Sequence, residues 1–510
     1  MPHTYIKRIL DARIYDLAVE TPLDIAKSLT RRLDNRVLLK REDLQPVFSF
    51  KIRGAYNRLL QLTAEERSRG VIAASAGNHA QGLAYSAQHL GIDATIVMPR
   101  TTPAIKVEAV RGYGGRVVLH GDAFDEAAAH AHELVAEQGR IYIPPYDDPD
   151  VIAGQGTVAM ELLRQHPGNI DAVFVPVGGG GLAAGMAAYI KFVRPGIKVY
   201  AVEPEDAACL DAAMKAGERV VLPEVGIFAD GVAVAQIGEE PFRVLQDTID
   251  GVITANTDEI CAAIKDIFED TRSIAEPAGA VSLAGLKKYV AQNKVSGQTL
   301  IAIDSGANTN FDRLRYISER TEIGEQREAV LAVTLPERPG AYRQFCADLG
   351  RRNITEFNYR FASHRAAHVF VGVAVAPGGD DRKALVNELS DKGYQVLDLT
   401  ENEMAKAHIR HLVGGHNPDS DADAAITERV FRFEFPERPG TLMKFLSHLG
   451  DRWNISLFHY RNHGSAFARI LVAFQVPVAD QDALTAFLDA MPAGRYWDET
   501  ENPAYQLYLA

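Results

Sequence analysis

The sequence is poor in the features that mark secreted, zinc-binding or membrane-spanning proteins. It holds only three cysteines, Cys209, Cys261 and Cys346, which stand far apart and form no Cys-x-x-Cys pair. This spacing excludes a disulfide framework and the common kind of zinc site, so we expect reduced thiols in a cytoplasmic protein. The chain has no run of ~20 apolar residues, which excludes a membrane-spanning helix. Its first ten residues lack the apolar core of a signal peptide.

Basic residues are also fewer than acidic ones. Lysine and arginine number 54 against 67 aspartates and glutamates, which gives a net charge of -13. An acidic chain is a poor partner for nucleic acid or an anionic membrane, so the expected partner is a small molecule. A chain of 510 residues exceeds what one hydrophobic core serves, and two to four domains are expected.

The first 310 residues alternate short β-branched runs with alanine-rich segments of helical periodicity. The predicted strands are Val37–Lys40, Val71–Ala74, Ala94–Met98, Val117–Leu119, Ile141–Ile143, Ala172–Val175, Val199–Val202 and Leu300–Ile303. Near-continuous apolar strands separated by helices are typical of parallel sheets covered on both faces, which predicts an α/β fold. Such folds bind ligands where their strands end, so the residues after each strand are the candidates for a site.

Lys51 stands directly after Phe48-Ser49-Phe50, an aromatic segment that favours burial, and opens a helical pattern from Ile52 to Leu62. Apolar surroundings disfavour the charged form of a lysine, so its pKa falls and its amine becomes nucleophilic. A lysine that binds a carbonyl group covalently needs this chemistry. The alternative is that Lys51 reaches solvent from the start of a helix.

A small-residue turn follows the second predicted strand and leads into a helix from Ala80 to Leu90. It consists of Ser75, Ala76, Gly77, Asn78 and His79. Backbone N–H groups at a helix start form a binding place for a carboxylate or phosphate, and an asparagine there can contact a ligand hydroxyl. Equally, the turn can cap its helix without any ligand. The histidine invites an acid–base role, but a histidine beside a turn is more often structural.

A glycine loop follows the strand that ends at Val175. It consists of Gly178, Gly179, Gly180 and Gly181, with Leu182 next. Four glycines are entropically unfavourable in a folded chain unless the backbone must approach another group closely, as it does around an anion. No Gly-Lys-Ser/Thr follows, which excludes a Walker loop. A dinucleotide loop with Glu203 as its acidic residue fits loosely, whereas a site for a single phosphate fits better.

Two further candidates lie later in the chain. Ser305 follows the last predicted strand and can face a heteroaromatic nitrogen or cap the next helix. Glu224, Phe228 and Asp230 are spaced so that two carboxylates and a carbonyl could bind a hard cation. The alternative is that no cation binds and that Glu224 and Asp230 are ordinary surface carboxylates beside a turn.

Taken together, these features match the needs of pyridoxal phosphate, which requires a lysine, a phosphate cradle and partners for its ring hydroxyl and ring nitrogen. Four motifs, Ser49–Ala55, Ser75–Gly82, Gly178–Leu182 and Ser305–Asn308, resemble those of the fold-type II pyridoxal-phosphate enzymes, most closely the serine/threonine dehydratase branch. The fold implied is a catalytic body of two parallel-type αβα subdomains.

The resemblance also implies roles for individual residues. Lys51 would bind the aldehyde of the cofactor, the turn from Ser75 to His79 would hold the substrate carboxylate, and Asn78 would contact the ring hydroxyl. The other cofactor contacts implied are Phe50, Gly178, Gly179, Gly180, Gly181, Leu182 and Ser305.

The last third of the chain contains an internal repeat. Leu335-Pro336-Glu337-Arg338-Pro339-Gly340 recurs 100 positions later as Phe435-Pro436-Glu437-Arg438-Pro439-Gly440. Each copy predicts a strand, a Pro-Gly turn, a helix and two further strands. This pattern resembles ACT-type regulatory domains, which are ferredoxin-like βαββαβ modules that bind amino acids. The alternative is a pair of domains used only for oligomerisation.

These features divide the chain into a catalytic domain at 1–315, a connector helix at 316–327, ACT-like domains at 328–402 and 428–500, and a linker at 403–427. A catalytic domain followed by two such copies resembles the biosynthetic threonine dehydratases (threonine ammonia-lyases).

That resemblance implies deamination of L-threonine to 2-oxobutanoate and ammonia, with activity on L-serine as well. It also implies inhibition by isoleucine, valine as a candidate activator, and a homotetramer. The residues expected at the effector site are Arg352, Tyr359 and Tyr460. The alternatives are a serine dehydratase, a serine racemase, or an amino-acid sensor that has lost its active site.

Overall fold

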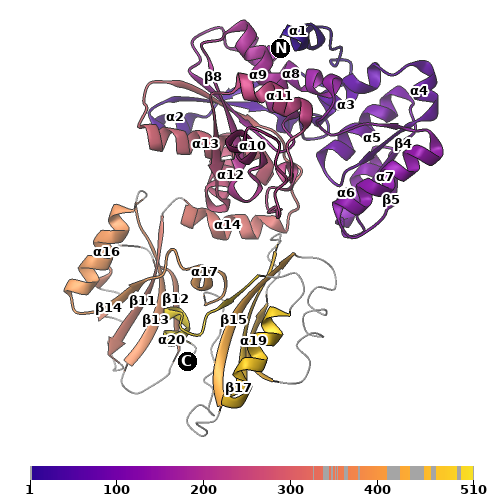
Figure 1. Ribbon diagram of the computed structural model, residues 1–510. Helices are drawn as coiled ribbons and strands as arrows, with labels where there is room; N and C mark the ends of the chain where they lie inside the picture. The colour runs from indigo at the N-terminus through magenta and orange to yellow at the C-terminus, as the bar shows by residue number, and fades with distance from the viewer. Residues whose placement is uncertain are drawn as a thin grey trace. The chain divides into compact units, whose positions relative to one another are not determined.

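The computed structural model describes residues 3–324, 327–336, 344–345, 348–350, 352, 354–360, 366–376, 379–409, 426–436, 453–460, 467–490 and 495–508. The chain forms two compact units, Met1–Ile317 and Ser318–Ala510, each drawn as a separate body in Figure 1. Within the described residues, no helix has both the length and the apolar character needed to cross a membrane.

A six-stranded sheet forms the centre of the first unit, in the order β1-β2-β10-β7-β8-β9. Its strands are β1 (Leu23–Ile25), β2 (Arg36–Arg41), β7 (Ala172–Pro176), β8 (Lys198–Pro204), β9 (Gly251–Ala255) and β10 (Thr299–Asp304). All neighbouring pairs are parallel except β1 and β2. The predicted α/β fold is therefore confirmed, although β1 and β9 were not among the predicted strands.

Helices cover both faces of this sheet because its strands are apolar on both sides. Val173 and Val175 of β7 pack into one core, while Ala172 and Phe174 of the same strand pack into another. The first core is closed by α1 (His3–Leu10), α8 (Pro149–Gln165), α9 (Gly181–Val193), α10 (Cys209–Ala216) and α11 (Glu239–Thr248). The second is closed by α2 (Lys27–Leu33), α12 (Thr257–Thr271), α13 (Pro277–Asn293) and the first turns of α14 (Arg313–Gly324).

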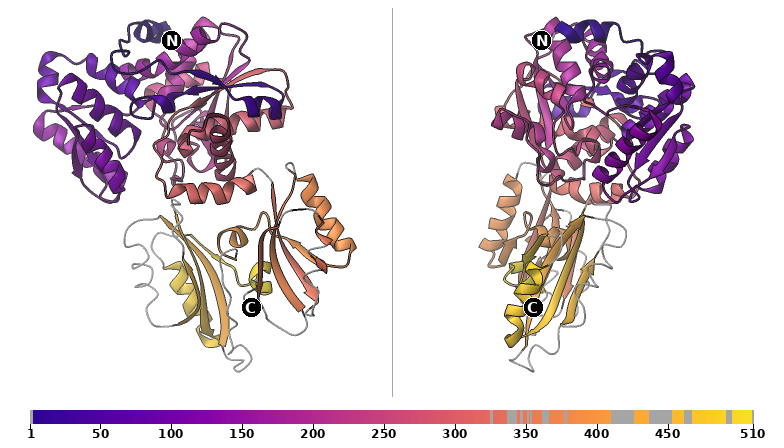
Figure 2. Two further views of the ribbon diagram at one scale, coloured as in Figure 1. Left: turned by 180° about the vertical axis from the view of Figure 1, so that it is seen from behind. Right: turned by 45° about the vertical axis from the view of Figure 1, so that its right-hand side comes forward.

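A smaller parallel sheet, β5-β4-β3-β6, forms a second layer system in the same unit. It contains β3 (Val71–Ala74), β4 (Ala94–Met98), β5 (Arg116–Leu119) and β6 (Ile141–Tyr142). Its helices are α3 (Lys51–Leu60), α4 (Ala64–Arg69), α5 (Asn78–Leu90), α6 (Ala104–Gly112) and α7 (Phe124–Gln138). The two views in Figure 2 show this small subdomain beside the large one.

The second unit contains two four-stranded antiparallel sheets, β12-β13-β11-β14 and β16-β17-β15-β18. The strands are β11 (Glu328–Pro336), β12 (Ile354–Arg360), β13 (Ala366–Ala374), β14 (Gln395–Asp398), β15 (Ile426–Pro436), β16 (Asn454–Tyr460), β17 (Phe467–Pro477) and β18 (Arg495–Asp498). Both sheets have the strand order of a ferredoxin-like module, as expected. Their described helices are α16 (Asp380–Asp391), α17 (Glu403–Ala407), α19 (Gln481–Asp489) and α20 (Pro503–Tyr508). The helices predicted after the two Pro-Gly turns fall largely outside the described residues.

The two copies share one core and meet at equivalent positions. That core joins residues of both sheets to α17 and α20, including Phe370 from the first copy and Leu471 from the second. The Asn402 side-chain amide donates a 3.3 Å hydrogen bond to Oδ1 of Asn502, its counterpart 100 positions later. Contact between equivalent residues indicates that the copies are related by an approximate twofold axis. The helix α17 lies at the start of the segment that the sequence predicted as a linker.

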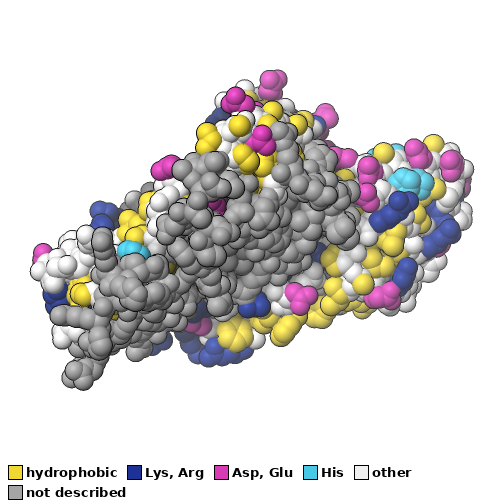
Figure 3. Space-filling model, turned by 90° about the horizontal axis from the view of Figure 1, so that it is seen from below, with side chains coloured by type: hydrophobic (Ala, Val, Ile, Leu, Met, Phe, Trp, Pro, Cys, Tyr) yellow, Lys and Arg dark blue, Asp and Glu magenta, His cyan; other side chains and the backbone are white. Residues whose placement is uncertain are grey.

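Acidic and basic side chains are interspersed on the part of the surface that Figure 3 draws in colour. Mixed charge of this kind is typical of a solvated surface. Cys209 and Cys261 are buried, and Cys346 lies outside the described residues.

Candidate active site

Lys51 is the first residue of α3, and a short bridge joins its segment to the end of β10. Ser49 pairs with Gly306, Phe50 N–H donates to the Ser305 carbonyl at 3.3 Å, and the Ala307 N–H donates to Phe48 at 2.9 Å. This bridge places the motif around Lys51 directly beside the motif around Ser305, although the two are about 250 residues apart in sequence.

The Lys51 side chain is largely removed from water. Its Nζ donates a 2.9 Å hydrogen bond to the Pro145 carbonyl and lies 5.2 Å from the centre of the Phe50 ring. Burial lowers the pKa of Lys51 to about 8, against the opposing effect of the Glu276 charge. The amine is therefore readily available in its neutral, nucleophilic form near neutral pH.

A fully buried ion cluster fixes the beginning of α3. The Arg53 guanidinium, two residues after Lys51, binds Glu42 at 2.7 Å and Glu161 at 2.6 Å, and Lys40 binds Glu161 at 2.6 Å. All four side chains have zero exposure. Paired charges at such depth hold one geometry, because displacing either partner leaves a buried charge without compensation. Glu42, 11 positions before Arg53, and Glu161, 108 positions after it, were not among the residues predicted from the sequence.

The turn from Ser75 to His79 ends at the start of α5, where its half-exposed residues Ser75, Ala76 and Gly77 lead to two buried side chains. A Cβ built on Gly77 would meet nothing within 4 Å, so the turn borders open space. Its N–H groups at the helix start are consistent with a carboxylate site. His79 is tied to the Ile143 carbonyl at 2.9 Å, and burial, with the Lys51 charge, lowers the pKa of His79 to about 3. It is thus a neutral, structural histidine.

Asn78 links the turn to the large subdomain. Its amide donates to Glu276 Oε1 at 2.5 Å, and its Oδ1 accepts from Asn308 at 2.7 Å. Burial, together with the charge of Asp230, raises the pKa of Glu276 to about 7. Glu276 is a functional candidate that was not among the residues predicted from the sequence.

The glycine loop lies between β7 and α9 and requires residues without side chains. Gly180 has a φ of +91°, and a Cβ on Gly179 would overlap the ring of Tyr146. A Cβ on Gly178 would lie 2.8 Å from the Cα of Val232. The N–H groups at the start of α9 are placed as a phosphate cradle would require. Glu203, weighed as a dinucleotide acid, instead accepts from the N–H groups of Leu210 and Asp211 at the start of α10.

Contacts within the first unit bring all four motifs together. Pro145 accepts from Lys51 while its neighbour Tyr146 packs on the glycine loop, and Asn308 joins Ser305's segment to Asn78. Ser305 is buried, and its hydroxyl makes a 3.3 Å hydrogen bond to the Ala278 carbonyl. A low-pKa lysine, a glycine cradle and a buried hydroxyl fit pyridoxal phosphate, which needs each of these groups.

The predicted cation ligands are differently engaged. The Phe228 carbonyl accepts from Arg313 at 2.9 Å, while the Asp230 carboxylate binds Lys106 at 2.5 Å and Arg313 at 3.4 Å. This arrangement does not fit a metal ion, because two positive side chains already occupy the oxygens and would repel it. The exposed Glu224 lies in the same loop. The described residues contain no group of three or more His, Cys, Asp or Glu able to hold a metal.

The effector candidates lie in the second unit. Arg352 binds Asp381 at 2.9 Å and Glu388 at 3.0 Å, both on α16. Tyr359 and Tyr460 occupy strands β12 and β16, and their side chains lie outside the described residues.

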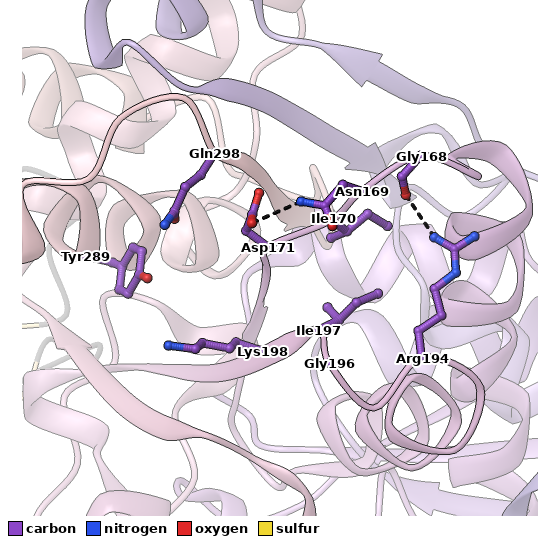
Figure 4. Close-up of a pocket in the computed structure, with 10 residues that line it drawn as sticks. All are labelled: Gly168, Asn169, Ile170, Asp171, Arg194, Gly196, Ile197, Lys198, Tyr289 and Gln298. Atoms are coloured by element: carbon purple, nitrogen blue, oxygen red, sulfur yellow. Dashed lines mark hydrogen bonds between the residues drawn. The ribbon is translucent and has the colours of Figure 1, made fainter.

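A separate cavity of about 370 Å³ opens at the amino ends of β7, β8 and β10 (Figure 4). Its lining includes Asp171, Arg194, Lys198, Tyr289 and Gln298. Ligands of parallel sheets bind at the opposite, carboxyl ends, where the predicted site residues of this unit lie.

The comparisons with known proteins agree with this geometry. Residues 14–306 match the family described as pyridoxal-phosphate-dependent enzyme. Residues 319–409 and 424–509 match the C-terminal regulatory domain of threonine dehydratase. The chain is 54% identical over 511 residues to the biosynthetic L-threonine dehydratase of Burkholderia multivorans, covering 100% of this chain and 99% of the relative.

Solved structures give the same result for the first unit. The processed form of threonine deaminase isoform 2 from Solanum lycopersicum matches with a TM-score of 0.62 and 50% identity, over 62% of this chain and 93% of that one. Maize serine racemase is more distant, with a TM-score of 0.58 and 34% identity over 61% and 95% of the two chains. The chain therefore belongs to the biosynthetic threonine dehydratase family of pyridoxal-phosphate-dependent enzymes, with a duplicated C-terminal regulatory region.

Proposed function

We propose that this chain converts L-threonine into 2-oxobutanoate and ammonia, and that it also acts on L-serine. Full-length identity to a biosynthetic threonine dehydratase supports this proposal, and the observation that carries it is the half-buried, low-pKa Lys51 at the junction of four motifs. In the reaction threonine loses its Cα proton and its β-hydroxyl as water, and water then releases ammonia from the remaining carbon skeleton.

The chain's own groups divide this work. Lys51, Phe50, Asn78, Ser305 and the residues from Gly178 to Leu182 would hold pyridoxal phosphate, which would supply the electron-withdrawing group that acidifies Cα. The N–H groups from Ser75 to His79 bind the substrate carboxylate. Lys51, whose pKa burial lowers to about 8, removes the proton at Cα. Ser305 would offer a hydroxyl rather than a carboxylate to the ring nitrogen, which would leave that nitrogen uncharged.

The test is replacement of Lys51. Lys51→Ala should lower threonine turnover by ~10⁴-fold or more and change the visible absorbance of the cofactor, because both the covalent partner and the base are removed. Lys51→Arg, which keeps the charge, should be equally inactive. Added ethylamine should partly restore turnover of Lys51→Ala. Normal activity in either variant contradicts the assignment.

Assays with threonine and with serine, analysed for keto acid and for D-serine, separate a threonine dehydratase from a serine dehydratase or racemase.

We also propose that isoleucine inhibits the enzyme through the second unit and that valine opposes it. The match to a threonine dehydratase regulatory domain supports small-molecule binding there. Arg352, Tyr359 and Tyr460 are the proposed effector contacts. The proposed domains are a catalytic domain at 1–315, a connector at 316–327, and regulatory copies at 328–402 and 428–500. The border between the two compact units, after Ile317, supports the first division. We further propose that the enzyme is a homotetramer located in the cytoplasm.

A further inference from the structure

The segment Phe228–Val232, which includes the short turn of Asp230, contacts both subdomains of the catalytic unit. Val232 lies against Gly178 of the glycine loop. A Cβ on Gly231 would lie 2.8 Å from the Ala278 side chain and 3.4 Å from Glu276 Oε1, which binds Asn78. The segment is therefore in contact with both the glycine loop and the residues beside the substrate turn.

One end of this segment is held by the small subdomain. Lys106 extends from α6, whose Val107 and Val110 pack in the core of the small sheet, and its Nζ lies 2.5 Å from Asp230 Oδ2. The side chains of this pair are 15% and 29% exposed, respectively. The pair joins the two subdomains across the site. The α3–α8 contact, where Asn57 donates to the Asp150 carbonyl at 2.7 Å, joins them toward the other end of the unit (Figure 1).

The same segment is held by the beginning of α14. Arg313 binds both the Phe228 carbonyl and the Asp230 carboxylate, and the Tyr316 ring lies 5.4 Å from the Phe228 ring. Burial alone would raise the pKa of Asp230, but the charges of Lys106 and Arg313 lower it below its ordinary value. The carboxylate is thus shared by two cations from separate elements, and α14 continues along the chain into the second unit.

We propose that Asp230, held between Lys106 and Arg313, is a positioning residue that keeps the small subdomain closed over the site and links that closure to the start of α14. Closure excludes water from the site and completes the substrate contacts, so opening weakens substrate binding more than it slows chemistry. The link gives a change at α14 a direct route to the closed state. The inference rests on the proposed function only for the choice of threonine and isoleucine as test compounds.

The experiment compares holoenzyme variants that lose equivalent ion pairs. Lys106→Met and Asp230→Asn each remove the shared contact. Lys191→Met is the matched control, because Lys191 and Asp250 form a 2.6 Å pair of similar exposure within the large subdomain. Hydroxylamine forms an oxime with the cofactor's aldehyde carbon and releases the amine of Lys51, so it reports opening of the site through the loss of visible absorbance. Because this readout does not depend on the substrate, it remains informative even if threonine is not turned over.

Lys106→Met and Asp230→Asn should raise the hydroxylamine rate and the KM for threonine by about three- to tenfold with a smaller change in kcat. Lys106→Arg and Lys191→Met should behave as wild type. Equal rates and KM values in Lys106→Met and Lys191→Met would overturn the closure role. Arg313→Gln should raise the isoleucine concentration for half-inhibition by about threefold or more, and unchanged inhibition would overturn the link to α14. Normal unfolding midpoints confirm that each variant is folded.

Discussion

Lys51 shows how an ordinary side chain acquires reactivity from its surroundings. Its amine has the Pro145 carbonyl and the Phe50 ring as close partners, and burial lowers its pKa to about 8. Each unit of pKa shift corresponds to about 1.4 kcal/mol between the two protonation states. The fold therefore makes proton removal by this amine accessible near neutral pH, which the free amino acid does not allow.

His79 provides a pH-dependent test at the residue scale. The folded protein lowers its pKa from 6.5 to about 3, so the unfolded chain binds the proton first as the pH falls. The stability that neutral His79 contributes is thus present above pH 6.5 and lost as the pH falls toward 3. His79→Gln, whose amide can still donate to Ile143, should show a smaller decline.

The measurement is urea unfolding followed through the cofactor absorbance, at several pH values. The free energy of unfolding of the wild type, relative to that of His79→Gln, should fall by up to ~1.4 kcal/mol per pH unit below 6.5. A difference between the two proteins that stays constant with pH would show that His79 is not the group responsible.

Sequence patterns predicted Lys51, Asn78 and Ser305 because each stands in a short motif of unusual composition. Glu276 was not assigned a role, since its importance comes from a 2.5 Å contact with Asn78, which lies 198 positions away. Glu42 and Glu161 were not predicted either, because neither stands in a motif and their pairing with Arg53 appears only in the folded structure. A charged residue in a helix or turn looks like a surface residue until its partner is known.

At the scale of elements, the glycine loop is the part of the site least tolerant of added atoms. Gly179→Ala should weaken cofactor binding at least tenfold, because its Cβ would overlap the Tyr146 ring and displace the loop from the phosphate. Gly196→Ala is the control, since a Cβ there meets nothing within 4 Å. Titration of the cofactor-free protein, followed by absorbance, measures both. Equal affinity in the two variants would mean that Tyr146 moves aside easily.

Most strands of the catalytic unit could be predicted because apolar runs such as Val71–Ala74 end at turn residues. The strands β1 and β9 could not. The first has three residues and pairs antiparallel at the sheet edge, and the second begins with Gly251 and is half-buried over four of its five residues. Both lie at the edges of the six-stranded sheet, and a short edge strand is recognised mainly through the one neighbour with which it pairs.

For the whole molecule, the two units have separate cores, which predicts that catalysis survives loss of the second. A chain ending at residue 327 should turn over threonine at a rate of the same order as the full chain and should no longer respond to isoleucine. The family of pyridoxal-phosphate-dependent enzymes matches residues 14–306 only, which lie within the first unit and support this expectation. Turnover measured with increasing isoleucine tests it, and a truncated chain that is still inhibited would place the effector site in the first unit.

The contact between Asn402 and Asn502 has a consequence for dilution. The two regulatory copies bury a common core, as the subunits of a dimer do, but one polypeptide carries both. Their effective concentration is set by the chain between them and not by the amount of protein in solution. The paired surface should therefore persist at nanomolar protein, so that any effector response built on it is independent of enzyme abundance.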